Sequence, residues 1–179
     1  LIPERESGKN PQLLWYGNFK NYNNTGDKVI LEGKFSHPVY NKRNWKYEEI
    51  RDGIWKWFKE DGTIDVERVY FEGKPVGQWK LYYDKDFKEI SDEKNASFYR
   101  EIEFNKDGSV NTDKNVIDYF ITGEKQFEGK ILSINPDVLD GKCTFYHKNG
   151  KIESVIIFEK GTQVKVLEAY DENGKKIRK

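Results

Sequence analysis

The sequence predicts an all-β protein: an elongated antiparallel meander of repeated β-hairpins in a single-layer sheet, with little or no helix. Three observations support this fold class. A glycine–aromatic motif recurs along the chain, tight-turn dipeptides separate runs of apolar and aromatic residues, and no stretch combines the helical period with capping residues. A single hairpin is only marginally stable in water, so repeated hairpins must stack to bury their side chains.

The recurring motif is clearest in the middle and at the end of the chain. "GIWKWF" begins at Gly53 and is followed 24 residues later by "GQWKLY" from Gly77. "GKCTFY" from Gly141 has the same outline, and "YHKNGKI" from Tyr146 returns as "YDENGKKI" from Tyr170. Repetition at a fixed spacing is typical of repeat architectures.

Each repeat is predicted to be two strands joined by a tight turn, because Asp-Gly and Asn-Gly between apolar runs are the strongest short-range hairpin signal. The turns are Asp61-Gly62, Asp107-Gly108, Asn149-Gly150 and Asn173-Gly174. At the opposite end of the repeat, residues 73–77 (GKPVG) are predicted to turn the chain back. Residues 133–140 are predicted to form a longer loop.

A chain of 179 residues fits one domain. We expect a single repeat domain over residues 1–179. Residues 1–50 form degenerate N-terminal strands, with Leu14–Tyr16, Val29–Phe35 and Trp45–Tyr47 as the candidates. Residues 51–90 hold clear repeats, residues 91–118 a weak one, and residues 119–179 clear repeats again.

The composition indicates a thin core built from aromatic rings. Hydrophobic residues make up only 36% of the chain, and the mean hydropathy is -0.92, yet 15% of the residues are aromatic. The 31 basic residues balance the 31 acidic ones, whereas nucleic-acid binders carry a basic excess, so we expect no nucleic-acid partner. The lone Cys143 leaves no intrachain disulfide.

Strand alternation assigns the aromatic residues to two faces. Trp55 and Trp79 occupy the same repeat position and are predicted to form a core column. A single-layer sheet cannot cover both of its faces, so other rings stay accessible, and tyrosine and tryptophan dominate protein interfaces. The predicted binding residues are Phe58, Tyr82, Tyr83, Tyr146 and Tyr170.

We predict no catalytic residue, no metal site and no cofactor. His37 and His147 are the only histidines, and no zinc-binding spacing is present. We expect His147 to be a solvated turn residue. Cys143 takes the repeat position of Trp55 and is predicted to pack rather than react. The acidic stretch 84–94 lacks the pattern of a calcium loop and is predicted to be a solvated strand end or loop.

The pattern Gly-x-Trp-x-x-aromatic, followed by Asn/Asp-Gly and then by an aromatic residue and Gly-Lys, resembles the MORN repeat. More closely it resembles the variant found in bacterial proteins described as YwqK-type antitoxins. The resemblance covers Gly53–Lys88 and Tyr119–Lys179, a little over half of the chain. It implies a single-layer sheet of hairpins and binding roles, such as scaffolding, membrane association, or antitoxin and immunity functions. It implies no catalytic residues.

We therefore expect a non-catalytic protein-binding repeat module, an antitoxin-like, immunity-like or scaffold protein of bacterial type, with a protein partner not yet identified. The alternative is a cell-envelope protein that binds carbohydrate or lipid through exposed aromatic residues. An enzyme would need a deep pocket lined by paired carboxylates. The polar segment 3–12 is typical of residues that follow a cleaved leader, so an exported or cell-envelope location and a cytoplasmic one both stay open.

Overall fold

The computed structural model describes residues 2–4, 12–14, 16–90 and 93–177. Its elements are β1 (Ile2–Glu4), β2 (Gln12–Leu14), β3 (Gly17–Tyr22), β4 (Val29–Phe35), β5 (Val39–Asn41), β6 (Lys46–Glu48), β7 (Gly53–Phe58), β8 (Ile64–Phe71), β9 (Lys74–Tyr83), β10 (Glu89–Ile90), the 3-10 helix η1 (Glu93–Asn95), β11 (Phe98–Phe104), β12 (Val116–Phe120), β13 (Lys125–Ile131), β14 (Leu139–Tyr146), β15 (Ile152–Glu159) and β16 (Thr162–Ala169). Trp15, which belongs to the predicted N-terminal strand, lies outside the described residues.

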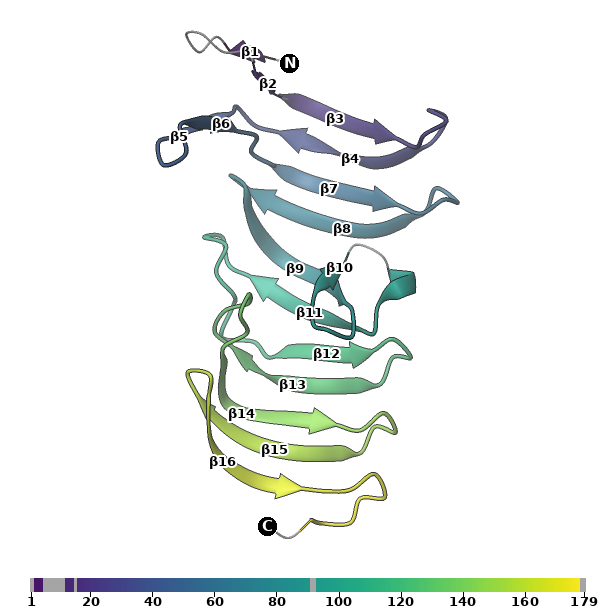
Figure 1. The fold of residues 1–179 in the computed structure, drawn as a ribbon, viewed down its shortest axis with the longest axis vertical. Coiled ribbons are helices and arrows are strands. Elements are labelled where there is room, and N and C mark those ends of the chain that lie inside the picture. The colour runs from purple at the N-terminus through teal and green to yellow at the C-terminus, as the bar shows by residue number, and fades with distance from the viewer. Residues whose placement is uncertain (1, 5–11, 15, 91–92, 178–179) are drawn as a thin grey trace. The chain divides into compact units, whose positions relative to one another are not determined.

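Twelve strands form one antiparallel sheet in the order β3-β4-β7-β8-β9-β11-β12-β13-β14-β15-β16, and β10 pairs with β9 beside this path. Two further sheets are the two-stranded pairs β1-β2 and β5-β6. Successive strands of the meander follow the order of the chain, with β5-β6 inserted between β4 and β7 and with β10 and η1 between β9 and β11, and they run in alternating directions (Figure 1). The predicted all-β antiparallel meander of hairpins is confirmed, and the one helical element among the described residues is the three-residue η1.

The chain divides into two compact units. Unit 1 comprises residues 1–77 with 106–108, and unit 2 comprises residues 78–105 with 109–179. Strand β9 therefore begins in unit 1 and ends in unit 2. That residues 1–179 act as a single repeat domain stays a prediction.

The four predicted Asp-Gly and Asn-Gly turns are all present. In each of these dipeptides the glycine has a positive φ and the Asp or Asn before it does not. In the turn after β14, the amide of His147 donates to the carbonyl of Lys151 at 2.9 Å and the amide of Gly150 donates to the carbonyl of His147 at 2.9 Å. Gly150 has φ +78, a left-handed conformation that glycine adopts without a Cβ penalty. This is the three-residue hairpin with glycine in the left-handed position.

The predicted turn at residues 73–77 is wrong in position. The chain reverses at Glu72-Gly73, both with positive φ, because Phe71 and Lys74 are already paired across β8 and β9. Pro75 lies inside β9, opposite Tyr70. The longer loop predicted for residues 133–140 is present between Ile131, the end of β13, and Leu139, the start of β14, so the last two residues of the prediction belong to β14 instead.

Two strand glycines explain how the core is packed. Gly33 lies beside Trp55, where an ideal Cβ on Gly33 would be 2.2 Å from Cδ2 of the indole. Gly129 lies beside Cys143, where such a Cβ would be 2.7 Å from the sulfur. Trp55 and Cys143 are both 0% exposed, so the predicted equivalence of their repeat positions and their packing roles are confirmed. Trp79, 8% exposed, is also in the core as predicted.

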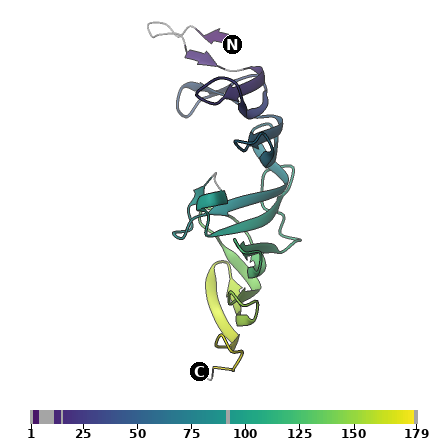
Figure 2. The ribbon, with the colours of Figure 1, turned by 90° about the vertical axis from the view of Figure 1, so that its right-hand side faces the viewer.

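Unit 2 has one partly covered face. The segment that carries β10 and η1 stands to one side of β9 and β11 (Figure 2). From this segment Phe87 reaches Phe98, with ring centroids 5.3 Å apart, and Phe98 stacks on Tyr83 at 5.0 Å. We call this the covered face of unit 2.

Candidate binding surfaces

The opposite face of unit 2 carries a row of tyrosines. Tyr99 and Tyr119 are cross-strand partners in β11 and β12, so their side chains share a face. Their rings stack with centroids 4.9 Å apart and an interplanar angle of 16°. Tyr82 extends the row, 6.2 Å from Tyr99. Tyr146 lies within hydrogen-bonding range of Glu128, whose strand neighbours the strand of Tyr119. We call Tyr82, Tyr99, Tyr119 and Tyr146 the tyrosine face.

Charged side chains fix this row in place. The ammonium of Lys80 lies 3.9 Å from the ring centroid of Tyr99 and 5.0 Å from that of Tyr82. Lys125, opposite Tyr119 in the register, donates to Glu128 at 2.8 Å. Hydrogen bonding from Lys125 lowers the pKa of Glu128. The rings therefore lie among charged groups that are already engaged, Lys80 with the rings and Lys125 with Glu128.

The tyrosine hydroxyls of this face remain neutral hydrogen-bonding groups. Burial raises the pKa of Tyr99, of Tyr119 and of Tyr146 above the ordinary value. All three rings are half-buried, so part of each stays open to solvent. A ring of this kind offers an apolar surface together with a hydroxyl that can donate and accept.

The structure does not bring the five predicted binding residues together. Tyr82 and Tyr83 are buried, 3% and 5% exposed, at the end of β9 where β10 pairs with both of them. They point to opposite faces, Tyr82 toward Tyr99 and Tyr83 toward Phe98. Phe58 is half-buried at the end of β7 in unit 1. The binding roles of these residues stay predictions.

The two remaining predicted residues lie near the C-terminal hairpins. Tyr146 belongs to the tyrosine face. Tyr170 follows β16 and is half-buried, and its carbonyl lies 2.9 Å from Nε2 of His147. His147 is thus half-buried and bridges two hairpins, so the prediction that it is a solvated turn residue is wrong. Residue spacing alone could not show this contact, because it joins neighbouring repeats.

Sequence reasoning missed Tyr99 and Tyr119 as binding candidates, although the signal was present. In the stretch "FYREIEF", Phe98, Ile102 and Phe104 fall on one strand face, which the structure buries, and Tyr99 falls on the other. The stretch departs from the glycine–aromatic repeat motif, which is why the motif alone did not indicate it.

The covered face of unit 2 contains a buried ionic triad. The guanidinium of Arg100 donates to both oxygens of Asp118, from Nε at 2.7 Å and from Nη2 at 2.9 Å, and from Nη1 to Asp137 at 2.9 Å. Burial alone would lower the pKa of Arg100, but the hydrogen bonds to both carboxylates outweigh it and the pKa is raised. Burial raises the pKa of Asp118, and its bidentate bond to Arg100 acts in the opposite direction by favouring the ionised carboxylate.

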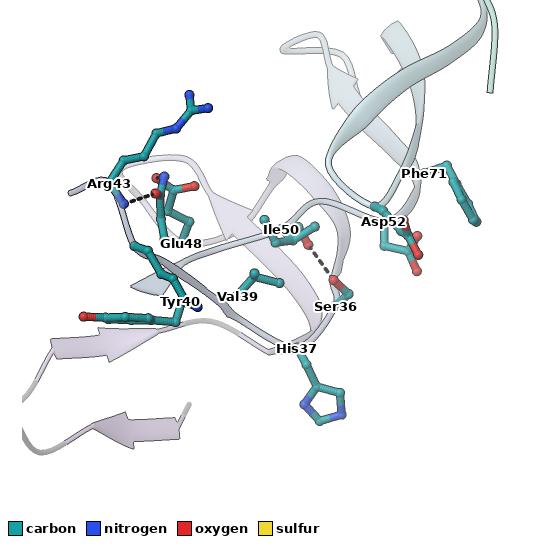
Figure 3. A pocket seen from close by; sticks show the side chains of 12 residues that line it. Ser36, His37, Val39, Tyr40, Arg43, Glu48, Ile50, Asp52 and Phe71 are labelled. Atoms are coloured by element: carbon teal, nitrogen blue, oxygen red, sulfur yellow. Dashed lines mark hydrogen bonds between the residues drawn. The ribbon is translucent and has the colours of Figure 1, made fainter. Parts of the chain in front are cut away.

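Unit 1 contains an open hollow beside the β5-β6 hairpin, with a volume of 920 Å³. Its labelled side chains do not converge: Tyr40 and Arg43 stand at one end, and Asp52 and Phe71 at the other (Figure 3). Glu48 is engaged by the amides of Asn41 and Asn44 at 2.8 and 2.9 Å, which lower its pKa. Among the described side chains that line this hollow, Ser36 donates to the carbonyl of Ile50 and Glu48 accepts from two amides, so both groups are engaged by the chain itself.

Two indole rings of unit 1, those of Trp55 and Trp57, are contacted by the guanidinium of Arg51. The Cζ of Arg51 lies 4.8 Å from the ring centroid of Trp55 and 5.6 Å from that of Trp57. Its Nη1 donates to the hydroxyl of Tyr70 at 3.0 Å. This cluster holds the ends of β7 and β8 together.

The described residues hold neither a candidate metal centre nor a helix that could cross a membrane. Within residues 2–4, 12–14, 16–90 and 93–177, no three His, Cys, Asp or Glu side chains are grouped to hold a metal ion. Over the same described ranges, no helix has the length and apolar character needed to span a bilayer.

Comparison with known proteins identifies the repeat. Residues 51–72 and 139–160 match the family model described as the MORN repeat variant. The two matches correspond to the hairpins that run from β7 into β8 and from β14 into β15. No curated protein and no solved structure matches the chain. No catalytic domain is identified. The hairpin meander thus contains two segments that match the MORN repeat variant, a module generally associated with protein binding.

Proposed function

We propose that this protein binds another protein through the tyrosine face of unit 2. The observation that carries the proposal is the row of stacked, half-buried rings of Tyr99 and Tyr119, with Tyr146 beyond them, on a face that the β10 segment leaves open. Because Tyr99 and Tyr119 pair directly across two strands, the row rests on rigid elements.

Tyrosine rows suit protein recognition for two physical reasons. Each ring contributes a large contact area at a low cost in side-chain entropy, because only two torsions must be fixed. Here that cost is already met before binding, since Lys80 lies over Tyr99 and Tyr119 stacks on Tyr99. Preorganised side chains convert more of their contact energy into affinity.

The charges around the row favour a partner of mixed polarity. Lys80, Lys125 and Glu128 surround the rings with both signs, and the whole chain is neutral, with 31 basic and 31 acidic residues. A polyanion such as nucleic acid would require a basic excess. A protein surface with its own hydrogen-bonding groups complements this face better.

The class of the protein partner is inferred from the sequence resemblance to the YwqK-type antitoxins. This resemblance makes a toxin-like or effector-like protein the first partner to test, whereas a scaffold role is the broader form of the proposal. The protein-binding association of the matched MORN repeat variant supports the broader form.

The experiment compares capture by three immobilised proteins: the wild type, Tyr119→Ala and Gln163→Ala. Gln163 is a matched control because it is exposed on β16 and pairs with Phe158, which belongs to the aromatic cluster of the opposite face. We expect a stoichiometric protein partner to bind the wild type and Gln163→Ala, and Tyr119→Ala to weaken binding about 30-fold, the loss typical of an interface hot spot. Equal binding by all three proteins would refute the proposal.

A different result would favour the carbohydrate or lipid alternative. If Tyr119→Ala abolished binding to glycans or to lipid vesicles while no protein partner was captured by the wild type, the tyrosine face would be a recognition surface for those ligands instead.

A further inference from the structure

The covered face of unit 2 contains a cavity of 260 Å³. Aromatic rings line its walls, from Phe87, Phe127 and Phe145, and Asp137 and Gln126 supply polar atoms. Cavities that hold drug-sized ligands range from about 300 to 1,000 Å³. This cavity therefore has the size of a single long side chain rather than of a large ligand.

The backbone at Phe87 is unusual in a way that points to this cavity. The turn at residues 84–88 has the hydrogen bonds of the other three-residue hairpins: the amide of Asp84 donates to the carbonyl of Lys88 at 3.0 Å, and the amide of Phe87 to the carbonyl of Asp84 at 3.2 Å. In the sister turns the left-handed position is a glycine, such as Gly150 or Gly174, but here it is Phe87, with φ 60.

A phenylalanine in this conformation is costly and gains little from burial. The Cβ of an L-residue crowds the backbone there, and Phe87 remains 67% exposed. Strained residues of this kind persist where a function uses them. Here the strain places a ring at the rim of the cavity, 5.3 Å from Phe98.

The polar groups of the cavity select the charge of its ligand. Arg100 directs Nε, Nη1 and Nη2 at Asp118 and Asp137, so little of its donor capacity remains for an anion. One cation faces two carboxylates, which leaves a net negative charge in the triad. Asp137 is partly exposed, and each of its oxygens keeps acceptor capacity beyond the bond to Arg100.

Gln126 provides a further acceptor. It is the additional residue of a bulge, because Asp118 pairs with Phe127 while Tyr119 pairs with Lys125. The bulge turns Gln126 toward the cavity that Phe127 lines. Its Oε1 is buried and has no hydrogen-bond partner among the described residues, a costly arrangement that a ligand donor would relieve once the side-chain amide turns toward the cavity.

We propose that this cavity binds the cationic end of one alkylammonium or alkylguanidinium chain, the size of a lysine or arginine side chain. The aliphatic stem packs on the rings of Phe127 and Phe145, and the cation faces Phe87, Asp137 and the Oε1 of Gln126. This site goes beyond the proposed function. Arg100 and Asp118 lie one position along from Tyr99 and Tyr119, so they point to the other face of the sheet, and either site can fail without the other.

The test follows the side-chain amide of Gln126 by NMR in the ¹⁵N-labelled full chain. The probes are n-butylammonium and n-butylguanidinium, with n-butanol as the neutral control. We expect saturable shifts of the Gln126 amide with one or both cations and none with butanol. Absence of a shift with both cations, or equal shifts with butanol, overturns the proposal.

Two variants separate binding from folding. Phe87→Gly should raise the thermal unfolding midpoint, because glycine fits the left-handed position, and should weaken cation binding about three- to tenfold, because a ring is lost. Gln126→Met keeps the volume but removes the acceptor, and should also weaken binding, measured by the shift of the Phe127 backbone amide. Unchanged affinity in both variants overturns the proposal.

The source of the cation is decided in the same assay. N-acetyl-lysine methylamide and N-acetyl-arginine methylamide present the groups as a peptide would. Tighter binding of these than of the free amines identifies a partner's side chain as the ligand. Tighter binding of the free amines identifies a small organic cation.

Discussion

The close approach of Gly33 to Trp55 gives the sharpest test of how the hairpins pack. The indole lies against the backbone of the neighbouring strand, and an alanine Cβ at position 33 would stand 2.2, 2.5 and 2.7 Å from three of its atoms. The ring cannot move aside easily, because its Nε1 donates to the carbonyl of Lys34 at 3.1 Å and Phe35 packs at 4.7 Å. The perturbation is Gly33→Ala.

The expected sign is opposite to the usual one. In a strand without such a contact, alanine would stabilise the protein relative to glycine by about 0.5–1 kcal/mol. Forcing additional volume into a packed core costs about 1–3 kcal/mol. Since Trp55 is 0% exposed and held on both sides, we expect the upper end, a loss of about 2–3 kcal/mol in the free energy of unfolding.

Urea unfolding followed by circular dichroism measures this loss, and a double-mutant cycle assigns it. In the background of Trp55→Leu, where the indole is absent, Gly33→Ala should cost less than about 0.5 kcal/mol or should stabilise the protein. A cost below about 0.5 kcal/mol in the wild type, or the same cost in both backgrounds, would refute the reasoning.

Three further predictions follow from individual residues. Trp79→Ala should lower the free energy of unfolding by about 3–5 kcal/mol in urea titrations, because the ring is 8% exposed and packs edge-on against Phe104; a loss below about 1 kcal/mol would place Trp79 outside the core. Gly150→Ala should cost about 1–2 kcal/mol, since φ is +78 and no atom lies near the added Cβ, and thermal unfolding that matches the wild type would contradict this. Burial raises the pKa of Tyr83 to about 12, so the unfolded chain ionises first and stability should fall by about 2 kcal/mol as the pH rises from 10 to 12; Tyr83→Phe should lack this share of the pH dependence, and an identical profile in both proteins would exclude it.

The sequence predicted the fold well because its main signals are local. A glycine that reaches a left-handed conformation, as at Gly150, specifies a hairpin within a few residues. Trp55 and Cys143 were predicted to occupy equivalent repeat positions, and in the structure each packs against a glycine of the adjacent strand. The reversal at Glu72-Gly73 was misplaced because Pro75 was interpreted as part of a turn, whereas it pairs within β9.

The candidate sites were harder to predict because they depend on pairing across strands. Tyr99 joins Tyr119 only through the register of β11 and β12. Gln126 reaches the cavity only because a bulge shifts its strand by one residue. Phe87 had a readable signal, since "YDKDFKEI" follows the pattern of "YHKNGKIE" with phenylalanine in place of glycine. The proposed binding role of Phe87, however, depends on the cavity beside it, which only the structure shows.

Light-induced crosslinking at two positions tests the central claim most directly, that the open tyrosine face holds a protein partner. A photoreactive phenylalanine analogue replaces Tyr119 in one protein and Gln163, on the opposite face, in the other. The account predicts a discrete covalent adduct with one protein from position 119 and none from position 163. An adduct from position 163 alone, or none from position 119 under conditions in which the partner is captured, would contradict it.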